Sequence, residues 1–336
     1  MKISKILLLT SFTCINCLTT DNEYKVKSFF NHIISFNKSY EDIYTYLQKF
    51  KTFEENLEYI KQHNNKDLPF KLAQNEYIDL SQDEFKDTFI GSLNKNDYYI
   101  NRLYGRSTCE DFVSNNDLDI PSSLDWRNQG VVTNVKNQGY CGSCWSFSAT
   151  GAMEGAYAIA HNKLVNISEQ QLIDCSKSYG NLGCNGGLMD AAFEYAIDYN
   201  MTTEEELPYE AKGHILCPSV EKHISFSSCT EVTQNNELHL LQAVSQQPVS
   251  IAIQADTKLF QFYSSGVITN VSCGTETDHG VLIVGYGVEK GIDYWLVKNS
   301  WGPTWGSDGY VKLERTNSED TEGMCGLATS AAYISV

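Results

Sequence analysis

The sequence predicts an α+β body that follows a separate, helix-bearing amino-terminal segment. Apolar residues recur with helical spacing at 144–160 and 188–199, and short apolar runs typical of strands follow at 249–253, 281–284 and 294–297. Because the helices come first and the strands later within 120–336, we expect a helical half beside a sheet half. A cleft between two such halves is a common place for a functional site.

The composition is that of an ordinary globular protein and argues against binding to polyanions. The 336 residues are 42% hydrophobic and 20% charged, and 42 acidic side chains outnumber 25 basic ones to give a net charge of −17. Such a charge repels a phosphate backbone or an anionic membrane. We therefore expect no nucleic-acid partner.

The first 19 residues are typical of a cleaved secretory signal. A basic start, Met1 to Lys5, is followed by a short apolar run that begins at Ile6. Polar residues interrupt this run, and it is shorter than the about 20 apolar residues that a membrane-spanning helix needs. We expect cleavage between Cys17 and Thr20, no membrane span, and a destination in the lysosome, the vacuole or the extracellular space, where disulfides form.

The segment 24–100 contains no cysteine and predicts one long amphipathic helix that ends at Asn64 and Asn65. Such a helix needs a partner surface, because its apolar face would otherwise be exposed to water. The polar stretch 94–119 has no convincing period, and we expect an exposed connector that is open to proteolysis. The apolar stripe of the helix consists of Tyr46, Phe50, Phe53, Leu57 and Ile60.

The pair Cys141 and Cys144 carries the strongest chemical signal. Two cysteines at this spacing belong to a redox dithiol, to half of a zinc site, or to disulfides with other partners. No matching second pair follows for zinc, and no βαβ setting precedes for a dithiol. What remains is one bridged cysteine and one unbridged cysteine that opens a helix, where the helix dipole favours a nucleophilic thiolate.

A thiolate nucleophile needs a base, and the base needs an orienting partner. Of the seven histidines, His279 alone leads directly into a strand-like apolar run, 281–284. The next predicted strand ends just before Asn299, so a hairpin brings the Asn299 amide back beside His279.

These residues resemble the papain family of cysteine proteases, closest to its cathepsin L branch, over nearly the whole chain. Cys141 to Trp145 match the family signature, and His279 and Asn299 follow Cys144 by 135 and 155 positions. The resemblance implies a two-lobed papain-like fold with a helical left lobe and an antiparallel, β-barrel-like right lobe. It also implies a cysteine endopeptidase that acts on protein and peptide substrates without a metal or other cofactor.

The resemblance assigns a role to each catalytic side chain. Cys144 is the nucleophile, His279 the general base and acid, and Asn299 the group that orients the histidine. Gln138 supplies the amide of the oxyanion hole. Trp301 shields the hydrogen bond between His279 and Asn299 from water, and Trp305 is expected either in packing or on the leaving-group side of the cleft.

Three disulfides follow from the resemblance, and two cysteines are left over. The implied pairs are Cys141 with Cys184, Cys175 with Cys217, and Cys273 with Cys325. Cys229 and Cys109 remain, either unbridged or joined to each other before maturation.

The resemblance divides the chain into a signal peptide at 1–19, an inhibitory propeptide at 20–119 and the mature protease at 120–336. The propeptide is expected to inhibit its own protease, to lean its apolar stripe on the protease body, and to loosen when acid protonates carboxylates such as Asp79. The family's propeptide motif is matched at Phe53, Asn56, Ile60 and Asn64, but Lys49 and Thr45 stand where the family has Arg and Glu. We expect a monomer, with cystatin-type proteins as further inhibitors.

Substrate contacts are likewise carried over from the family. They form an apolar S2 pocket with no acid at its base, and no occluding insertion follows Cys184, so an endopeptidase that prefers apolar P2 residues is expected. Sequons at Asn37, Asn166, Asn200 and Asn270 permit glycosylation. The substrate-binding residues are Gly186, Gly187, Leu188, Met189, Ala252, Asp278, Gly280, Trp301 and Ser330.

Two rival functions are distinguishable. A catalytically silent homologue would lack one of the four catalytic side chains, all of which are present. A secreted disulfide oxidoreductase that uses Cys141 and Cys144 would release two thiols on mild reduction, whereas a protease leaves Cys144 reactive beside a bridged neighbour.

Overall fold

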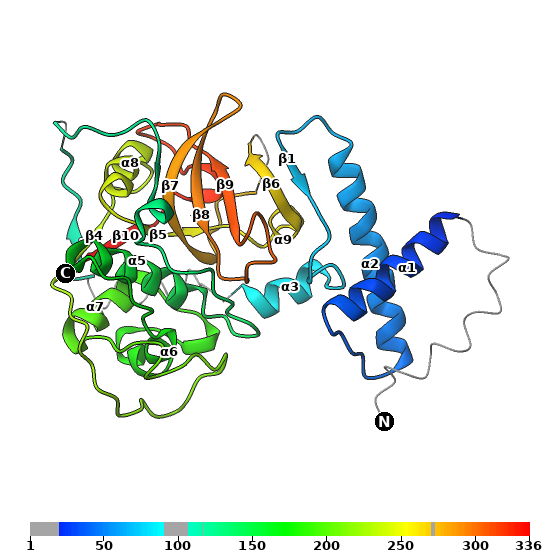
Figure 1. Ribbon diagram of the computed structural model, residues 1–336, viewed down its shortest axis with the longest axis horizontal. Helices are drawn as coiled ribbons and strands as arrows, with labels where there is room; N and C mark the ends of the chain where they lie inside the picture. Colours follow the sequence, from blue (N-terminus) through cyan, green and yellow to red (C-terminus); the bar gives the residue numbers. More distant parts are fainter. Residues whose placement is uncertain (1–19, 91–106, 116, 270–272) are drawn as a thin grey trace.

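The computed structural model describes residues 20–90, 107–115, 117–269 and 273–336. A body of helices and strands carries a helical extension, α1 to α3, on one side (Figure 1). The α+β class is thus confirmed, and the expected signal peptide lies outside the described residues. The helices are α1 (Thr20–Ser35), α2 (Ile43–Asn64), α3 (Gln82–Phe89), α5 (Cys144–His161), α6 (Glu169–Cys175), α7 (Met189–Tyr199), α8 (Glu237–Gln246) and α9 (Lys258–Phe262), with 3₁₀ turns at Trp126–Gln129, Ser176–Tyr179, Gly183–Asn185 and Met324–Gly326.

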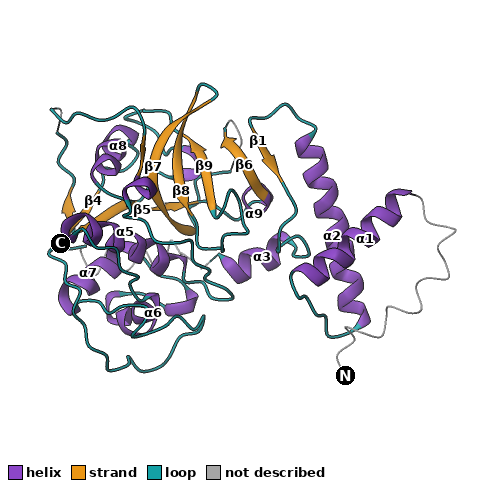
Figure 2. Ribbon diagram, viewed as in Figure 1, coloured by secondary structure: helices purple, strands orange, loops and turns teal. Residues whose placement is uncertain are grey.

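The strands form one open sheet with the order β1-β6-β9-β8-β7-β5-β10-β4-β2, and β3 pairs with β7 beside this path. The β6–β9 and β2–β4 pairs are parallel and the other described pairs are antiparallel, so the sheet is less uniform than a closed antiparallel barrel. Helices α5, α6 and α7 gather on one side of the strands, whereas α8 and α9 lie beside them (Figure 2). The strands are β1 (Phe70–Leu72), β2 (Glu110–Asp111), β3 (Leu124–Asp125), β4 (Ser228–Glu231), β5 (Val249–Ile253), β6 (Tyr263–Ile268), β7 (His279–Glu289), β8 (Ile292–Lys298), β9 (Tyr310–Glu314) and β10 (Ala331–Ser335).

Helix α5 joins the helical half to the sheet. It is buried over most of its length because two glycines let its backbone approach the sheet closely. A Cβ at Gly151 would lie 2.8 Å from Leu282, and one at Gly155 would lie 2.7 Å from Pro248. A larger residue at either position would push the helix, and Cys144 with it, away from β7.

The amino-terminal helices pack on one another, so the α2 stripe has an internal partner that the sequence did not predict. Its Phe53 and Ile60 also belong to one apolar core with body residues such as Phe260 and Phe262. Phe29 of α1 packs on Phe50 and Phe53 of α2, with ring centroids 5.2 and 5.1 Å apart. Buried Asn56 donates to the carbonyls of Ile78 and Leu80, which ties the following loop to α2. The segment also contacts the body through β1, which pairs with β6, and through α3, whose Phe85 packs on Trp301.

Asp79 is a structural ion-pair residue of the propeptide. Burial alone would raise its pKa, but His32 and Lys38, each 3.2 Å away, and the Tyr40 hydroxyl lower the pKa of Asp79 to about 2. Because the folded-state value lies below the ordinary 3.8, the stabilisation is complete above that pH and is lost only as the pH falls toward 2. The expectation that mild acid loosens the propeptide through Asp79 is therefore wrong.

The Lys at the position of the family's Arg still forms an ion pair. Lys49 of α2 lies 2.7 Å from Glu84 of α3, and this ion pair ties the two helices together. Glu84 also completes a capping box with Ser81 at the start of α3.

Part of the expected connector is ordered against the body. Residues 94–106 and 116 lie outside the described residues, but β2 pairs with β4, and Cys109 forms a disulfide with Cys229. The segment 107–115 is therefore not the loose linker that the sequence predicted. The other disulfides join Cys141 to Cys184, Cys175 to Cys217 and Cys273 to Cys325, which are the three pairs that the resemblance implies.

Candidate active site

Cys144 is the first residue of the 18-residue helix α5 and the one described cysteine that forms no disulfide. The Cys141–Cys184 disulfide and the hydrogen bond from Gly142 N to Cys184 O, 2.9 Å, fix the loop that leads into it. Ser143, at the N-cap position, places no side-chain oxygen on the helix, because its hydroxyl pairs with the Tyr209 hydroxyl at 2.7 Å. The positive end of the helix is thus left to stabilise negative charge on the sulfur.

His279 and Asn299 lie together at the ends of two paired strands. His279 opens β7, Asn299 follows β8, and His279 Nε2 lies 2.8 Å from Asn299 Oδ1. The Ser300 N–H donates to the same oxygen, which identifies it as the amide oxygen, so Nε2 carries the hydrogen. Nδ1 is then the nitrogen that can exchange a proton with a thiol.

The imidazole is covered on one face by an indole. The Trp301 ring stacks on His279 with centroids 4.6 Å apart, and neither side chain is exposed. Burial lowers the pKa of His279 to about 4, although the hydrogen bond with Asn299 acts in the opposite direction. In this closed form the imidazole is therefore neutral at neutral pH.

Residues of α5 just after Cys144 contact residues of β7 just after His279. A Cβ at Gly280 would lie 3.1 Å from Trp145 Cα, and the Ser148 hydroxyl donates to the Val281 carbonyl at 2.6 Å. Helix α5 and strand β7 thus hold Cys144 and His279 on the same side of their contact. Only glycine at 280 permits this approach.

Gln138 is positioned by the chain that follows Asn299. Its backbone N–H donates to Ser300 O at 2.8 Å, and the Ser300 hydroxyl donates to its side-chain oxygen at 2.6 Å. This turns the Gln138 amide nitrogen toward the Cys141 carbonyl, 3.0 Å away, and the Phe89 carbonyl, 2.9 Å away. A buried amide donor is therefore aimed at a backbone carbonyl of the propeptide.

Helix α3 of the propeptide lies over this group of side chains. Phe85 packs edge-on against Trp301 at 5.0 Å, and the Tyr77 hydroxyl donates to Trp301 O at 3.1 Å. Lys86 forms an ion pair of 2.6 Å with Asp256. The propeptide thus covers the histidine side of the site as well as Gln138.

Asp278 lies on the same side as Asp256. Its carboxylate accepts the Ala255 N–H at 2.8 Å, and burial, with a contribution from the charge of Asp256, raises the pKa of Asp278 to about 7. Lys86 opposes that rise.

The residues expected to form the S2 pocket meet at one place. Ala252 of β5 pairs with Gly280 of β7, Ser330 O accepts the Ala252 N–H at 3.0 Å, and a Cβ at Gly280 would lie 3.2 Å from Met189 Sδ. Leu188 is the N-cap residue of α7, directly before Met189, the first residue of that helix.

The remaining expected contacts have structural surroundings of their own. Gly187 packs against Trp145, since a Cβ there would lie 2.6 Å from the indole, and Gly186 has a φ of +119°. Trp305 is fully buried against Trp301 and donates to the Phe260 carbonyl, so of its two expected places it takes the packing one.

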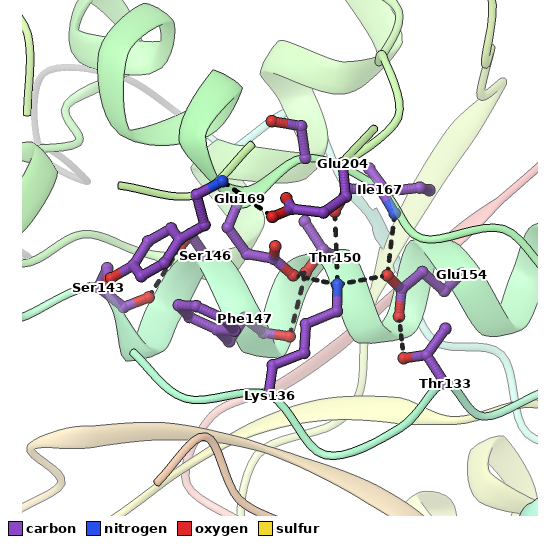
Figure 3. A network of polar contacts seen from close by, with 12 residues as sticks. Thr133, Lys136, Ser143, Ser146, Phe147, Thr150, Glu154, Ile167, Glu169 and Glu204 are labelled. Carbon is purple, nitrogen blue, oxygen red and sulfur yellow. Dashed lines mark hydrogen bonds and ion pairs between the residues drawn. The ribbon is translucent and has the colours of Figure 1, made fainter. Parts of the chain in front are cut away.

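A buried charged network behind the site was not predicted. Lys136 Nζ lies 2.7 Å from Glu154 and 2.6 Å from Glu169, and Thr150 also donates to Glu169 (Figure 3). Burial opposes the charge of Lys136, but the two carboxylates raise its pKa above the ordinary value. The one sequence signal was Glu154, an acid inside an otherwise apolar helix.

The network reaches the catalytic strand. Burial raises the pKa of nearby Glu204 to about 7 and lowers that of Lys298, which precedes Asn299, to about 8. Lys298 donates to Thr133, which in turn donates to Glu154. The loop of Gln138, the helix of Cys144 and the strand before Asn299 are thereby joined by buried polar contacts.

Comparison with known proteins agrees with this geometry. Residues 120–335 match the family described as "Papain family cysteine protease". The chain belongs to the papain family. Residues 29–85 match the "Cathepsin propeptide inhibitor domain (I29)", so this papain-family protein is a cysteine endopeptidase made as a proform with its own inhibitory propeptide.

Relatives of similar length support the assignment. The chain is 46% identical to vignain of Ricinus communis over 295 residues, which are 85% of this chain and 79% of that one. It is 42% identical to the cysteine protease XCP2 of Arabidopsis thaliana, over 92% of this chain and 85% of that one. Among solved structures, the proform of the ragweed pollen protease Amb a 11 has a TM-score of 0.83 at 39% identity, covering 94% of this chain and 95% of that one. Digestive procathepsin L 3 of Tenebrio molitor has a TM-score of 0.81 at 37% identity, covering 93% of this chain and 99% of that one.

Among the described residues, no helix is long and apolar enough to cross a membrane. No group of three or more His, Cys, Asp or Glu side chains in the same ranges is placed to hold a metal ion.

Proposed function

We propose that this endopeptidase hydrolyses peptide bonds through an acyl-enzyme on Cys144, with His279, Asn299 and Gln138 in the roles that the family resemblance gives them. The observation that carries the proposal is the hydrogen bond from the Gln138 amide to the Phe89 carbonyl. It supports the proposal because the Gln138 amide donates to a peptide carbonyl, the kind of group that a substrate would offer.

The reaction divides between these groups as follows. The proton of the Cys144 thiol passes to His279 and the sulfur attacks the carbonyl carbon. The oxygen that becomes negative accepts hydrogen bonds from Gln138 Nε2 and the Cys144 backbone N–H. His279 donates a proton to the nitrogen of the leaving amine as the C–N bond breaks. Water then attacks the thioester, its proton passes to His279, and the S–C bond breaks to release the acid. Asn299 keeps the ring oriented throughout.

The propeptide inhibits by occupying the same groups. Phe89 O takes the Gln138 donor, and Phe85 and Tyr77 cover Trp301. Burial also lowers the pKa of His279, which disfavours the imidazolium that the reaction needs.

The proposed S2 pocket favours an apolar side chain at P2. Leu188, Met189, Ala252, Gly280 and Ser330 offer no carboxylate to pair with a cation, and an unpaired buried charge is costly. Peptides with Leu, Phe or Val at P2 should be cleaved faster than those with Arg. Equal rates for Arg in a P2 library would contradict this pocket.

We further propose entry into the secretory pathway through residues 1–19 and delivery to a lysosome, a vacuole or the extracellular space, as a monomer that cystatin-type proteins inhibit. Asn37 and Asn166 of the sequons are exposed, Asn200 is half-buried, and Asn270 lies outside the described residues. Glycosidase-sensitive mass on the expressed protein, and loss of that mass when 2–19 are deleted, tests the routing.

The central test is Cys144→Ser measured beside Cys144→Ala and the unaltered protein. After acid treatment, the unaltered protein should hydrolyse a Phe-Arg fluorogenic peptide and be inactivated by an epoxide at one equivalent. Both variants should do neither while keeping the circular dichroism of the fold. Residual hydrolysis by Cys144→Ala equal to the unaltered rate would refute the role of Cys144.

A further inference from the structure

A short segment upstream of the papain-family region is attached to the protease body far from the cleft. Cys109 forms a disulfide with Cys229, a body cysteine that is only 2% exposed. Directly after it, β2 runs parallel to β4, and Phe112 N donates to Glu231 O at 2.9 Å. Strand β4 lies at the end of the body opposite to α1 and α2 (Figure 1).

Contacts on both sides of β2 extend the attachment to two helices. The Thr108 backbone and hydroxyl donate to Glu194 of α7, the latter at 3.1 Å. The Phe112 ring lies 5.3 Å from the His239 ring of α8, and Asn115 N donates to Gln242 of the same helix at 2.9 Å. The segment 107–115 is therefore bound by a covalent bond, a strand pairing and side-chain contacts to three elements.

We propose that the mature protease keeps residues 107–119 as a permanent part of its body, and that the propeptide is released by cleavage on the amino-terminal side of Cys109. The inference rests on the proposed function and concerns where its maturation acts. It places the end of the removable propeptide before Cys109 rather than at Ile120.

The reason is what a later cut would leave behind. Cleavage between Cys109 and Ile120 breaks the chain but leaves the propeptide joined to the body through Cys109 and Cys229. A tether of this kind holds a ligand at an effective concentration of about 1 mM. A propeptide with a Kd of about 10 μM would then remain about 99% bound to the cleft. Such a cut frees the active site only if the disulfide is also reduced.

A cut before Cys109 has the opposite effect. The inhibitory part, with Phe85, Lys86 and Phe89, loses its chain connection, and since 20–108 contain no cysteine it can be diluted or digested. The segment with β2 stays on β4 and continues to cover that end of the sheet. Productive activation under oxidising conditions and retention of 107–119 are therefore linked.

The first experiment identifies what the active protein contains. The full chain is acid-activated without reductant, labelled at Cys144 with an epoxide, and analysed by intact mass and amino-terminal sequencing before and after reduction. The expected result is a labelled species that contains Cys109, either in one chain or as a peptide that reduction releases. A labelled species that starts near Ile120 and contains no Cys109 peptide before reduction would overturn the proposal.

A matched variant separates the disulfide from the other contacts. The double change Cys109→Ser and Cys229→Ser removes the bond without leaving a new thiol. The serine variant and the cysteine form are each given a recognition sequence for an added specific protease between Asp119 and Ile120. Without reductant, that protease should activate the serine variant at least tenfold more than the cysteine form. Equal activation of both forms would refute the tether.

The outcomes distinguish this inference from the proposed function. If the serine variant becomes active, the endopeptidase assignment stands whatever the cysteine form does. If neither form hydrolyses peptide even after reduction and acid treatment, the assignment fails, and the mass of the processed chain still decides whether Cys109 is retained.

Discussion

The packing of α3 on the cleft can be tested through one phenylalanine. Phe85 is fully buried, and its ring lies 5.0 Å from Trp301, 5.4 Å from Tyr77 and 5.5 Å from Phe89. Replacing a buried phenylalanine by alanine costs about 3–5 kcal/mol. Since 1.4 kcal/mol is a factor of ten, Phe85→Ala should raise the fraction of precursor with an open cleft by about 10²- to 4 × 10³-fold.

The alkylation rate of Cys144 measures that fraction. Cys144 is buried in the precursor, so at neutral pH iodoacetamide reacts only with molecules whose cleft has opened. The matched control is Phe30→Ala, the same change on α1 at a side chain that is 37% exposed, which should alter the rate less than about threefold. If Phe85→Ala is alkylated no faster than Phe30→Ala, the contact of α3 with Trp301 does not hold the cleft closed.

Three further predictions concern the site and its pH dependence. Gln138→Ala should lower kcat of the mature enzyme by about 10²- to 10³-fold with Cys144 still alkylated, because one oxyanion donor is lost; steady-state kinetics measures this. Burial lowers the pKa of His63, so its contribution to propeptide stability is present above 6.5 and lost as the pH falls below that value. Alkylation of the precursor should therefore accelerate between pH 7 and 5, and His63→Gln should flatten that rise. Gly187→Ala should reduce the melting temperature and peptide hydrolysis together, because the new methyl group would lie 2.6 Å from the Trp145 ring.

Each of these has an outcome that contradicts it. Unchanged kcat in Gln138→Ala would remove the amide from the mechanism, with Gln246→Ala, an exposed glutamine on α8, as the control. A pH profile that is identical with and without His63 would assign the acid response to other groups. One of them is His279, whose pKa is also lowered by burial, to about 4. Normal stability and activity in Gly187→Ala would show that the loop can move away from Trp145.

The proposed catalytic residues stand out in the sequence because their signals are local. Cys144 opens a helix and His279 opens an apolar strand, and both properties are visible in short windows of sequence. Resemblance then supplied Gln138, whose own neighbourhood is that of an ordinary loop. The structure adds what the sequence could not show, that Ser300 orients the Gln138 amide.

The features that escaped prediction depend on pairing between distant parts of the chain. Strands β1 and β2 have three and two residues, too few for a period to be recognised. The Cys109–Cys229 bond links positions 120 residues apart, and sequence alone left that pair open. The propeptide core was not predicted because Phe29 lies on α1. The sequence predicted only the long helix with the apolar stripe and not α1, which covers that stripe.

The strand order places a propeptide-side strand at each end of the sheet, β1 beside β6 and β2 beside β4. An uncovered edge strand offers unpaired backbone groups to other chains and is a template for self-association. Release of the propeptide removes β1 and uncovers β6, while β2 remains on β4 if Cys109 is retained. The newly bare edge is short and carries Ser264, Ser265 and Gly266. The zymogen and the mature enzyme therefore differ in the exposure of one sheet edge, that of β6. The Ser and Gly residues of this edge pair poorly with strands of other chains.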